Sequence, residues 1–375
     1  MSKLPHTGTS IFTIMSALAT QHGAINLSQG FPNFPIDPRL REALQRAAVD
    51  ESHQYMPMPG HRGLREKIAA TVSRVYGRTV DPDREVTVTA GATQALFSAI
   101  QALAHPGDDV IMLDPSYDSY EPAVLLAGAR PVRVPLDDAF MPDWTRIAAA
   151  MSERTRLVII NNPHNPSGRT WREEDITALE DLAVRHPRMI ILSDEVYEFI
   201  AFDRPHLSVH RSPILRERSV VTSSFGKTFH ITGWKIGYVI APAPLMDELR
   251  KVHQFVVFCV NSVGQAALVD YLDQTDVTQL AAFYRNKRDR FRALMAGGRF
   301  QLLPCDGSYF QLARYDDISD EPDVAFCRRL VTEHGVAAIP LSVFNGDGRD
   351  RRMIRFCFAK DDTTLIEAAE RLCRI

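Results

Sequence analysis

Apolar stretches that end abruptly in polar or turn-forming residues recur along this chain. They read EVTVTAG, DDVIMLDP, RLVIINNP, MIILSDE and SVVTSSFG. Each is rich in β-branched residues and apolar on both faces, which predicts a buried strand. Helical patterns such as EEDITALEDLAVRH lie between some of them. This alternation predicts an α/β fold in which a mostly parallel central sheet is covered by helices on both sides.

The pattern changes near residue 275, where a charged helical stretch (FYRNKRDRFRALM) begins. It is followed by short strands (GSYFQLA and RMIRFCFA) and a closing helix (TTLIEAAERLCRI). These elements predict a smaller α+β domain. We expect an N-terminal segment over residues 1–45 that contributes to the small domain, a large domain over residues 46–272, and a small C-terminal domain over residues 273–375.

An apolar stretch near the N-terminus, IFTIMSALAT, could be mistaken for a signal peptide. Thr13 and Ser16 interrupt it, and one basic residue precedes it. We therefore expect a short helix packed on the surface. No apolar run reaches the roughly 18 residues that a membrane span requires, so we expect no membrane partner.

Composition and charge narrow the class of protein further. With 375 residues and 45% hydrophobic composition, the chain can bury a large core. The 43 Lys and Arg residues are interleaved with 46 Asp and Glu residues, so no basic stripe is available to a nucleic acid. The five cysteines are odd in number and form no C-x-x-C pair, which indicates reduced thiols and a cytoplasmic protein. We expect no metal site.

Candidate functional residues gather where the predicted strands end. Ligands of open α/β sheets bind at the carboxyl ends of the strands. The side chains expected there belong to Thr93, Tyr117, Asn165, Asp194, Tyr197, Ser224 and Lys227.

Lys227, in SSFGKTFHITGWKIGY, is the most informative of these residues. The GKT triplet resembles the end of a phosphate-binding P-loop, but Val221 occupies the position of a required glycine. A single lysine is ordinarily a surface residue. Its amine attacks an aldehyde only when unprotonated, a state favoured by a dry site and by nearby positive charge, which Lys235 and Arg355 could supply.

If the aldehyde is pyridoxal phosphate, other residues must hold its ring. Asp194 follows a buried strand, and its carboxylate would face the protonated pyridine nitrogen; the alternative is a helix or turn cap. Tyr197 is spaced to bring a hydroxyl to the same ring, or is a core tyrosine. Asn165, in NNPHNPSG, would donate to the phenolic oxygen, or is an ordinary turn residue.

The phosphate and the substrate also have candidates. TAGATQAL supplies a turn and a helix N-terminus at Ala92 and Thr93, whose free N–H groups suit a dianion. Ser224 and Lys235 would add a hydroxyl and a charge, and the Tyr117 ring would stack on the cofactor. Arg355 would grip a substrate α-carboxylate with its two-pronged guanidinium, or form a structural salt bridge.

Together these motifs resemble those of fold-type I, pyridoxal-phosphate-dependent aminotransferases of classes I and II, over almost the whole chain. The similar motifs are SSFGKTFHITGWKIGY, NNPHNPSG, SDEVY and RFCFA. Within this family, INLSQGFPNF, DPSYDSYEPA and GVAAIPLSVF are most similar to bacterial methionine aminotransferases and to the kynurenine aminotransferase/glutamine transaminase K group.

The resemblance implies further roles. Gly30 and Asn165 would help to hold the substrate carboxylate, and Phe12 would line the pocket. The family is dimeric with shared active sites, so Tyr55 would reach the partner's phosphate and Phe258 would border the partner's substrate pocket. Three positions depart from common family residues: Phe12 stands in place of Trp, Cys259 in place of His and Lys235 in place of Arg.

The implied activity is transfer of an amino group from an amino acid to a 2-oxo acid by a ping-pong mechanism. The residues named for the pocket are apolar or aromatic, so we expect neutral amino acids, with methionine first and kynurenine, glutamine or aromatic amino acids next. One alternative is a pyridoxal-phosphate-dependent cysteine-S-conjugate or cystathionine β-lyase. Another is a regulator whose aminotransferase-like domain only binds a ligand.

Overall fold

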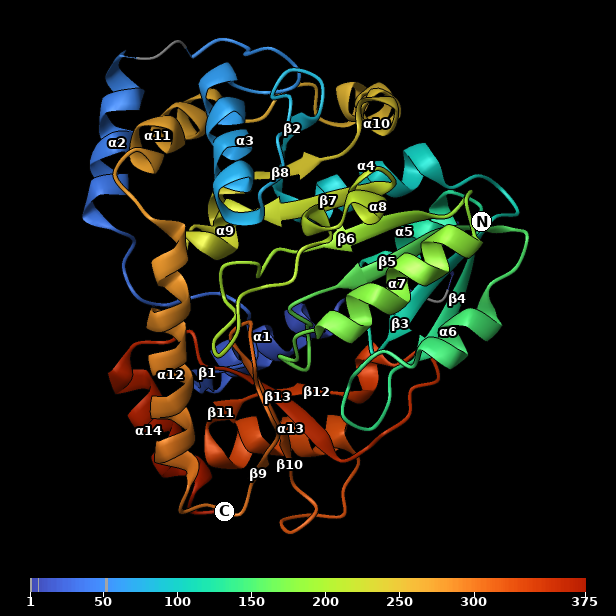
Figure 1. Cartoon of the computed structure of the whole chain (residues 1–375). Helices are drawn as coiled ribbons and strands as arrows, with labels where there is room; N and C mark the ends of the chain where they lie inside the picture. The colour runs from blue at the N-terminus through green and yellow to red at the C-terminus, as the bar shows by residue number, and fades with distance from the viewer. Residues whose placement is uncertain (1, 6, 51–52) are drawn as a thin grey trace.

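The protein consists of a large sheet with its helices and a smaller set of strands and helices beside it (Figure 1). The computed structural model describes residues 2–5, 7–50 and 53–375. The long helix α12 (Leu280–Met295) runs between the two parts.

The large sheet has seven strands in the order β2-β8-β7-β6-β5-β3-β4. Strand β8 is antiparallel to both of its neighbours, and the other pairs are parallel. The strands are β2 (Val86–Thr89), β3 (Asp109–Asp114), β4 (Arg130–Pro135), β5 (Thr155–Asn161), β6 (Ile190–Asp194), β7 (Ser219–Ser224) and β8 (Gly237–Ile240). The mostly parallel sheet is confirmed; β4 and β8 are additions to the five strands predicted above.

Helices cover both faces of this sheet, which explains why its strands are apolar on both sides. Along β5, Leu157 and Ile159 pack with α4, α5 and α10, whereas Val158 and Ile160 face α6 and α7. The helices of this part are α2 (Pro38–Asp50), α3 (Arg62–Tyr76), α4 (Gly91–Leu103), α5 (Tyr120–Leu126), α6 (Trp144–Ala150), α7 (Glu173–Arg185), α8 (Pro213–Arg216), α9 (Phe225–Thr228), α10 (Ala243–Val256) and α11 (Ser262–Leu272). Short 3₁₀ turns are η1 (Val209–Arg211), η2 (Thr232–Trp234) and η3 (Val277–Gln279); a fourth, η4 (Ser342–Phe344), follows β12 in the smaller part.

The smaller part is built around a four-stranded sheet of order β12-β13-β10-β9. Its elements after α12 are β9 (Gln301–Leu302), β10 (Phe310–Arg314), α13 (Asp323–His334), β11 (Val336–Ala337), β12 (Ile339–Pro340), β13 (Met353–Cys357) and α14 (Asp362–Leu372). Every residue of β13 is buried, so Arg355 enters the interior of the molecule from this strand.

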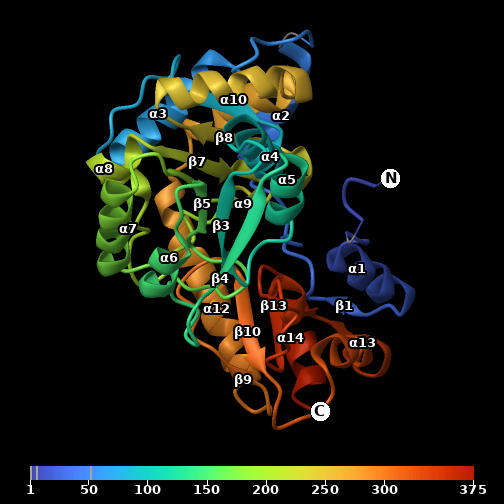
Figure 2. The same ribbon diagram turned by 90° about the vertical axis from the view of Figure 1, so that its right-hand side faces the viewer.

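The N-terminal segment joins the smaller part. Helix α1 (Ile11–Gln21) contacts α13, and Figure 2 shows the two helices in the same part of the molecule. Strand β1 (Ile25–Asn26) pairs in parallel with β11. The predicted boundary at residue 45 falls inside α2, which packs along α11. The division into these three segments, with its two boundaries, stays a prediction.

Helix α1 has the form expected from its sequence. The hydroxyl of Ser10 caps it by accepting a hydrogen bond from the amide of Phe12 at 3.3 Å. Met15 and Ala19 lie one turn apart and face the core. Among the residues that the model describes, no helix has both the length and the apolar character needed to cross a membrane.

Candidate active site

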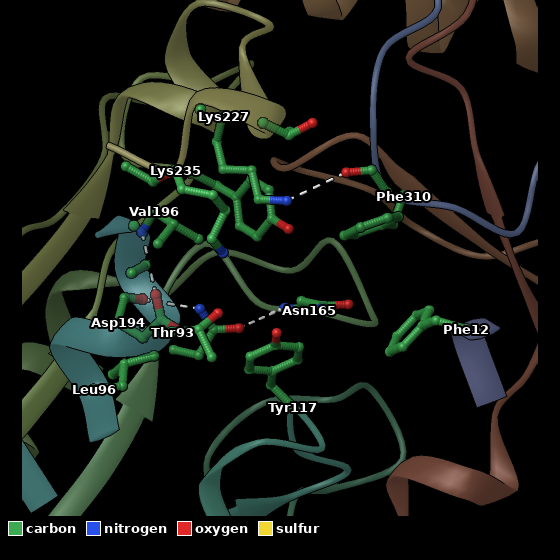
Figure 3. Close-up of a pocket in the computed structure, with 18 of the residues that line it drawn as sticks. Phe12, Thr93, Leu96, Tyr117, Asn165, Asp194, Val196, Lys227, Lys235 and Phe310 are labelled. Atoms are coloured by element: carbon green, nitrogen blue, oxygen red, sulfur yellow. Dashed lines mark hydrogen bonds between the residues drawn. The ribbon is translucent and has the colours of Figure 1, made fainter. Parts of the chain in front are cut away.

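A buried cavity of about 300 Å³ lies where the carboxyl ends of β5, β6 and β7 meet the N-terminus of α4. Figure 3 shows Lys227 and Tyr117 on opposite sides of this cavity, Asp194 at one end and Phe12 at the other. The predicted site residues that line it are Phe12, Gly30, Ala92, Thr93, Tyr117, Asn165, Asp194, Tyr197, Ser224, Lys227, Lys235 and Arg355. The carboxyl ends of the strands therefore bring residues that are far apart in the sequence to one place.

Lys227 lies on the short helix α9, directly after β7, and its amine points into the cavity. The amine donates to the carbonyl of Gly30 at 3.2 Å. Burial lowers the pKa of Lys227 to about 8, and the positive charges of Arg355 and Lys235 act in the same direction. An appreciable fraction of the amine is therefore unprotonated at slightly alkaline pH.

Asp194 is the last residue of β6 and pairs in register with Asn161, the last residue of β5. One carboxylate oxygen accepts a hydrogen bond from the hydroxyl of Tyr120 at 2.6 Å. Burial raises the pKa of Asp194 to about 6, while the contact with Tyr120 opposes that rise. A carboxylate held in this way is available to a cation that enters the cavity.

Arg355 is 1% exposed and reaches the cavity from β13. Its guanidinium donates to the side-chain oxygen of Asn165 at 2.7 Å and to the carbonyl of Ser28 at 3.0 Å. Nε has no partner among the described residues. Burial lowers the pKa of Arg355 to about 10. A buried guanidinium that contacts neutral oxygens and keeps a free N–H suits an anionic ligand.

The N-terminus of helix α4 and the side chain of Lys235 add further positive charge to the cavity. Helix α4 begins at Gly91, and its first residues, Gly91, Ala92 and Thr93, line the cavity. The N–H groups in the first turn of a helix have no partner within that helix. Gly91 has φ +74°, and a Cβ atom there would lie 3.3 Å from Nζ of Lys235. The lysine thus sits directly against the helix N-terminus. With Ser224 beside them, these groups form a suitable site for a phosphate.

Tyr55 and Phe258 lie outside this chain's own cavity. Tyr55 is 83% exposed and Phe258 is 47% exposed, and their rings meet edge to face at 5.4 Å. Two further exposed apolar side chains, Phe255 and Val256, lie close by in sequence. The predicted contact of Tyr55 and Phe258 with a partner's site stays a prediction.

Several residues of the site were missed by sequence reasoning. Asn161 and Phe310 line the cavity, and Tyr120 and Tyr309 contact residues that do. Asn161 had a signal, because it precedes Asn165 by four positions in the same motif. Tyr120 had a weaker one, since it lies three residues after Tyr117 in the same DPSYDSYEPA motif.

Comparisons with known proteins agree with this geometry. Residues 22–372 match the family model of class I and II aminotransferases. The chain is 52% identical over 375 residues to the methionine aminotransferase of Escherichia coli K12, covering 99% of this chain and 97% of that protein. It is 33% identical to a kynurenine–oxoglutarate transaminase of Dictyostelium discoideum, covering 98% of this chain and 94% of that protein.

Solved structures show the same relationship. An E. coli structure described as having a methionine aminotransferase function superposes with a TM-score of 0.97 and 51% identity, covering 100% of this chain and 99% of the other. The N-succinyldiaminopimelate aminotransferase of Mycobacterium tuberculosis superposes with a TM-score of 0.96 and 39% identity, with the same coverage.

The fold and the cavity therefore define an aminotransferase, and the chain belongs to the class I and II aminotransferase family. Enzymes of this family depend on pyridoxal phosphate, and they act on amino acids and 2-oxo acids. The comparisons give no support to the lyase or regulator alternatives.

Proposed function

We propose that this aminotransferase binds pyridoxal 5'-phosphate in the cavity and transfers the amino group of a neutral, largely apolar L-amino acid, with methionine preferred. The observation that carries the proposal is that one cavity contains both a reactive amine, that of Lys227, and a buried carboxylate, that of Asp194. Lys227 has a lowered pKa, and Asp194 has no cation in hydrogen-bond contact among the described residues. An aldehyde with a protonated ring nitrogen suits both groups.

The other lining residues fit the same cofactor. The N-terminus of α4, Ser224 and Lys235 would hold the phosphate, and Tyr117 would lie against the ring. Tyr197 and Asn165 would donate to its phenolic oxygen. The bound cofactor would supply an electron sink for the electrons of the substrate's α-carbon.

The chain's own residues would then carry out substrate binding and proton transfer. Arg355 would bind the α-carboxylate with two parallel hydrogen bonds, aided by Asn165 and Gly30. The free amine of Lys227 would accept the proton of the α-carbon and deliver it as a general acid, which its pKa of about 8 allows near neutral pH. Reversal of these steps with a 2-oxo acid would complete a ping-pong cycle.

The proposed preference for substrates with an apolar side chain rests on the aromatic rings that surround Arg355. Its guanidinium lies 3.8 Å from the ring centroid of Phe310, 5.2 Å from that of Phe12 and 5.4 Å from that of Phe344. The cations that line the described cavity are Lys227, Lys235 and Arg355. Each already has a proposed role, so the described lining from this chain offers no cation to a second carboxylate. Relatives named for methionine and kynurenine support methionine first, with kynurenine, glutamine and aromatic amino acids next.

A half-reaction assay tests this proposal. Enzyme loaded with pyridoxal phosphate is mixed with one amino acid at a time, without a 2-oxo acid, and the cofactor absorbance is followed. Methionine should change the spectrum fastest and in one turnover, because the amino group stays on the enzyme. Faster reaction with aspartate than with methionine would contradict the substrate proposal. Pyruvate and ammonia released from an S-conjugate would favour the lyase instead.

We also propose that two copies form a homodimer with shared active sites in the cytoplasm. The exposed aromatic pair Tyr55 and Phe258 supports the shared site, and free cysteines suit a reducing compartment. Lys227→Ala and Tyr55→Ala enzymes can be mixed, unfolded and refolded together. A shared site predicts recovered activity, because one site of each hybrid dimer then has both native residues. No recovery would contradict sharing.

A further inference from the structure

Tyr120 contacts Asp194 but is not among the residues that line the active-site cavity. It is the first residue of α5 and is 3% exposed. Its hydroxyl lies 2.6 Å from Oδ2 of Asp194. Its ring lines a separate small void that it shares with Tyr117, Asn161 and Asn165. Tyr120 therefore contacts the carboxylate of Asp194 without being among the residues that line the active-site cavity.

This contact is the shortest that the Asp194 carboxylate makes among the described residues. The other oxygen, Oδ1, accepts a hydrogen bond from the amide of Val196 at 3.4 Å. A hydroxyl–carboxylate distance of 2.6 Å lies in the range of charge-assisted hydrogen bonds. Oδ2 is thus held by Tyr120, while Oδ1 stays largely free for a ligand in the cavity.

The direction of the hydrogen bond is fixed by the chemistry of the two groups. Burial raises the pKa of Tyr120 well above its ordinary value, and the charge of Asp194 adds to the rise. Tyr120 therefore keeps its proton near neutral pH and donates it to the ionised carboxylate of Asp194. A donor of this kind stabilises the ionised carboxylate.

The charged groups near Asp194 have opposite effects on its pKa. The positive charge of Lys227 favours ionisation, whereas the negative charge of Glu195 opposes it. The hydroxyls of Tyr117 and Tyr197 also lie near enough to sense the Asp194 charge. If Lys227 loses its proton, Tyr120 remains as the largest contribution that opposes the effect of burial.

The same residue also supports the predicted stacking ring. The rings of Tyr120 and Tyr117 meet edge to face, with centroids 5.6 Å apart and an interplanar angle of 82°. The amide of Tyr120 donates to the carbonyl of Tyr117 at 3.2 Å. One side chain thus links the ring that would cover the cofactor to the carboxylate at the cavity's end.

We propose that Tyr120 is a positioning residue that acts through Asp194, keeping that carboxylate ionised and aimed at the ring nitrogen of the cofactor. This inference rests on the proposed binding of pyridoxal phosphate. Loss of the hydroxyl would let Asp194 take up a proton more readily. A neutral Asp194 cannot stabilise a positive charge on the ring nitrogen, so the cofactor would bind more weakly.

Tyr120→Phe tests the inference, because it removes only the hydroxyl. In the apoenzyme labelled with ¹³C at aspartate carboxyl carbons, the Asp194 signal is assigned by its loss in Asp194→Asn. We expect its titration midpoint to rise in Tyr120→Phe. The dissociation constant of pyridoxal phosphate should rise roughly 10- to 100-fold, the range for a hydrogen bond to a charged group. An unchanged midpoint with unchanged affinity would overturn the inference.

Tyr238→Phe is the matched control. Its hydroxyl is buried and donates to the carboxylate of Glu198 at 2.8 Å, away from the Asp194 carboxylate. We expect Tyr238→Phe to leave both the Asp194 midpoint and the affinity for pyridoxal phosphate unchanged. If both phenylalanine variants shift the two quantities alike, the effect is a general loss of packing and the inference is wrong.

Two further measurements keep the test decisive. If Tyr120→Phe does not fold, 3-fluorotyrosine placed at position 120 supplies a more acidic and stronger donor, and the Asp194 midpoint should then fall. An unchanged midpoint would overturn the inference. If the native enzyme binds no pyridoxal phosphate, the proposed function fails, whereas the apoenzyme titration still decides whether Tyr120 controls Asp194.

Discussion

Arg355 donates through Nη1 to the side-chain oxygen of Asn165 over 2.7 Å, across 190 positions of sequence. The bond joins β13 of the smaller part to the loop that follows β5 of the large sheet. It also fixes the amide of Asn165: with its oxygen occupied by Arg355, the amide nitrogen is left as the donor. The two parts of the molecule therefore meet at the residues proposed to bind the substrate.

Replacing Arg355 tests its role in binding the carboxylate. Arg355→Gln should raise KM and lower kcat/KM for methionine roughly 100-fold or more, because an ion pair and its parallel hydrogen bonds are lost. Arg355→Lys should recover only part of that loss, since lysine keeps the charge but not the two-pronged geometry. Steady-state kinetics measure both, and the cofactor absorbance should persist. An unchanged KM would show that the guanidinium serves the structure alone.

The reactivity of Lys227 in the apoenzyme should follow its lowered pKa. Trinitrobenzenesulfonate modifies only unprotonated amines, so labelling should increase with pH around a midpoint near 8, well below the ordinary value of 10.5. Mass spectrometry of the peptide that contains Lys227 provides the measurement. Lys227→Ala identifies that peptide's signal by its absence and should have no steady turnover. A midpoint near 10.5 would contradict the lowered pKa.

Asp194 should make the stability of the apoenzyme depend on pH. Its folded pKa of about 6 lies above the ordinary 3.8, so between these values the folded state holds a proton that the unfolded state has lost. Stability therefore falls as pH rises through this window, by on the order of 3 kcal/mol. Urea unfolding of the apoenzyme at several pH values measures the slope. Asp194→Asn cannot ionise at this position, so its stability should depend less steeply on pH, and its cofactor binding should be weaker. Equal slopes of stability against pH in the two proteins would refute the raised pKa of Asp194.

The sequence predicted the parts of the site that depend on local pattern. Lys227 and Asn165 follow buried strands and Asp194 ends one, and parallel strands bring such positions to one edge. Strand β4 was harder to identify, because only one of its residues is fully buried and its pattern is less apolar. Strand β8 has just four residues and runs against its neighbours.

Contacts between distant segments could not be predicted in the same way. The amine of Lys227 meets the carbonyl of Gly30 across 197 positions, and Tyr309 donates to the same carbonyl at 2.8 Å across 279 positions. A carbonyl oxygen has no side-chain signature, so neither periodicity nor motif spacing identifies it. Such contacts depend on how the N-terminal segment packs between the two sheets, which only the folded structure reveals.

Gly30 should tolerate no side chain. A Cβ atom there would lie 2.8 Å from Cζ of Phe310, closer than real contacts allow. The Phe310 ring cannot retreat, because it is buried and the guanidinium of Arg355 lies 3.8 Å from its centroid. Gly30→Ala should therefore cost about 1–3 kcal/mol of stability and displace Arg355, the residue proposed to bind the substrate carboxylate.

Kinetics and thermal unfolding of Gly30→Ala measure both effects. We expect a lower Tm together with a raised KM for methionine, because the overpacked ring lies directly against Arg355. Gly297→Ala is the matched control, since a Cβ atom at Gly297 meets no described heavy atom within 4 Å and its φ lies outside the left-handed region. A Gly30→Ala enzyme with native Tm and KM would show that Phe310 can move, and that the aromatic wall beside Arg355 is not rigid.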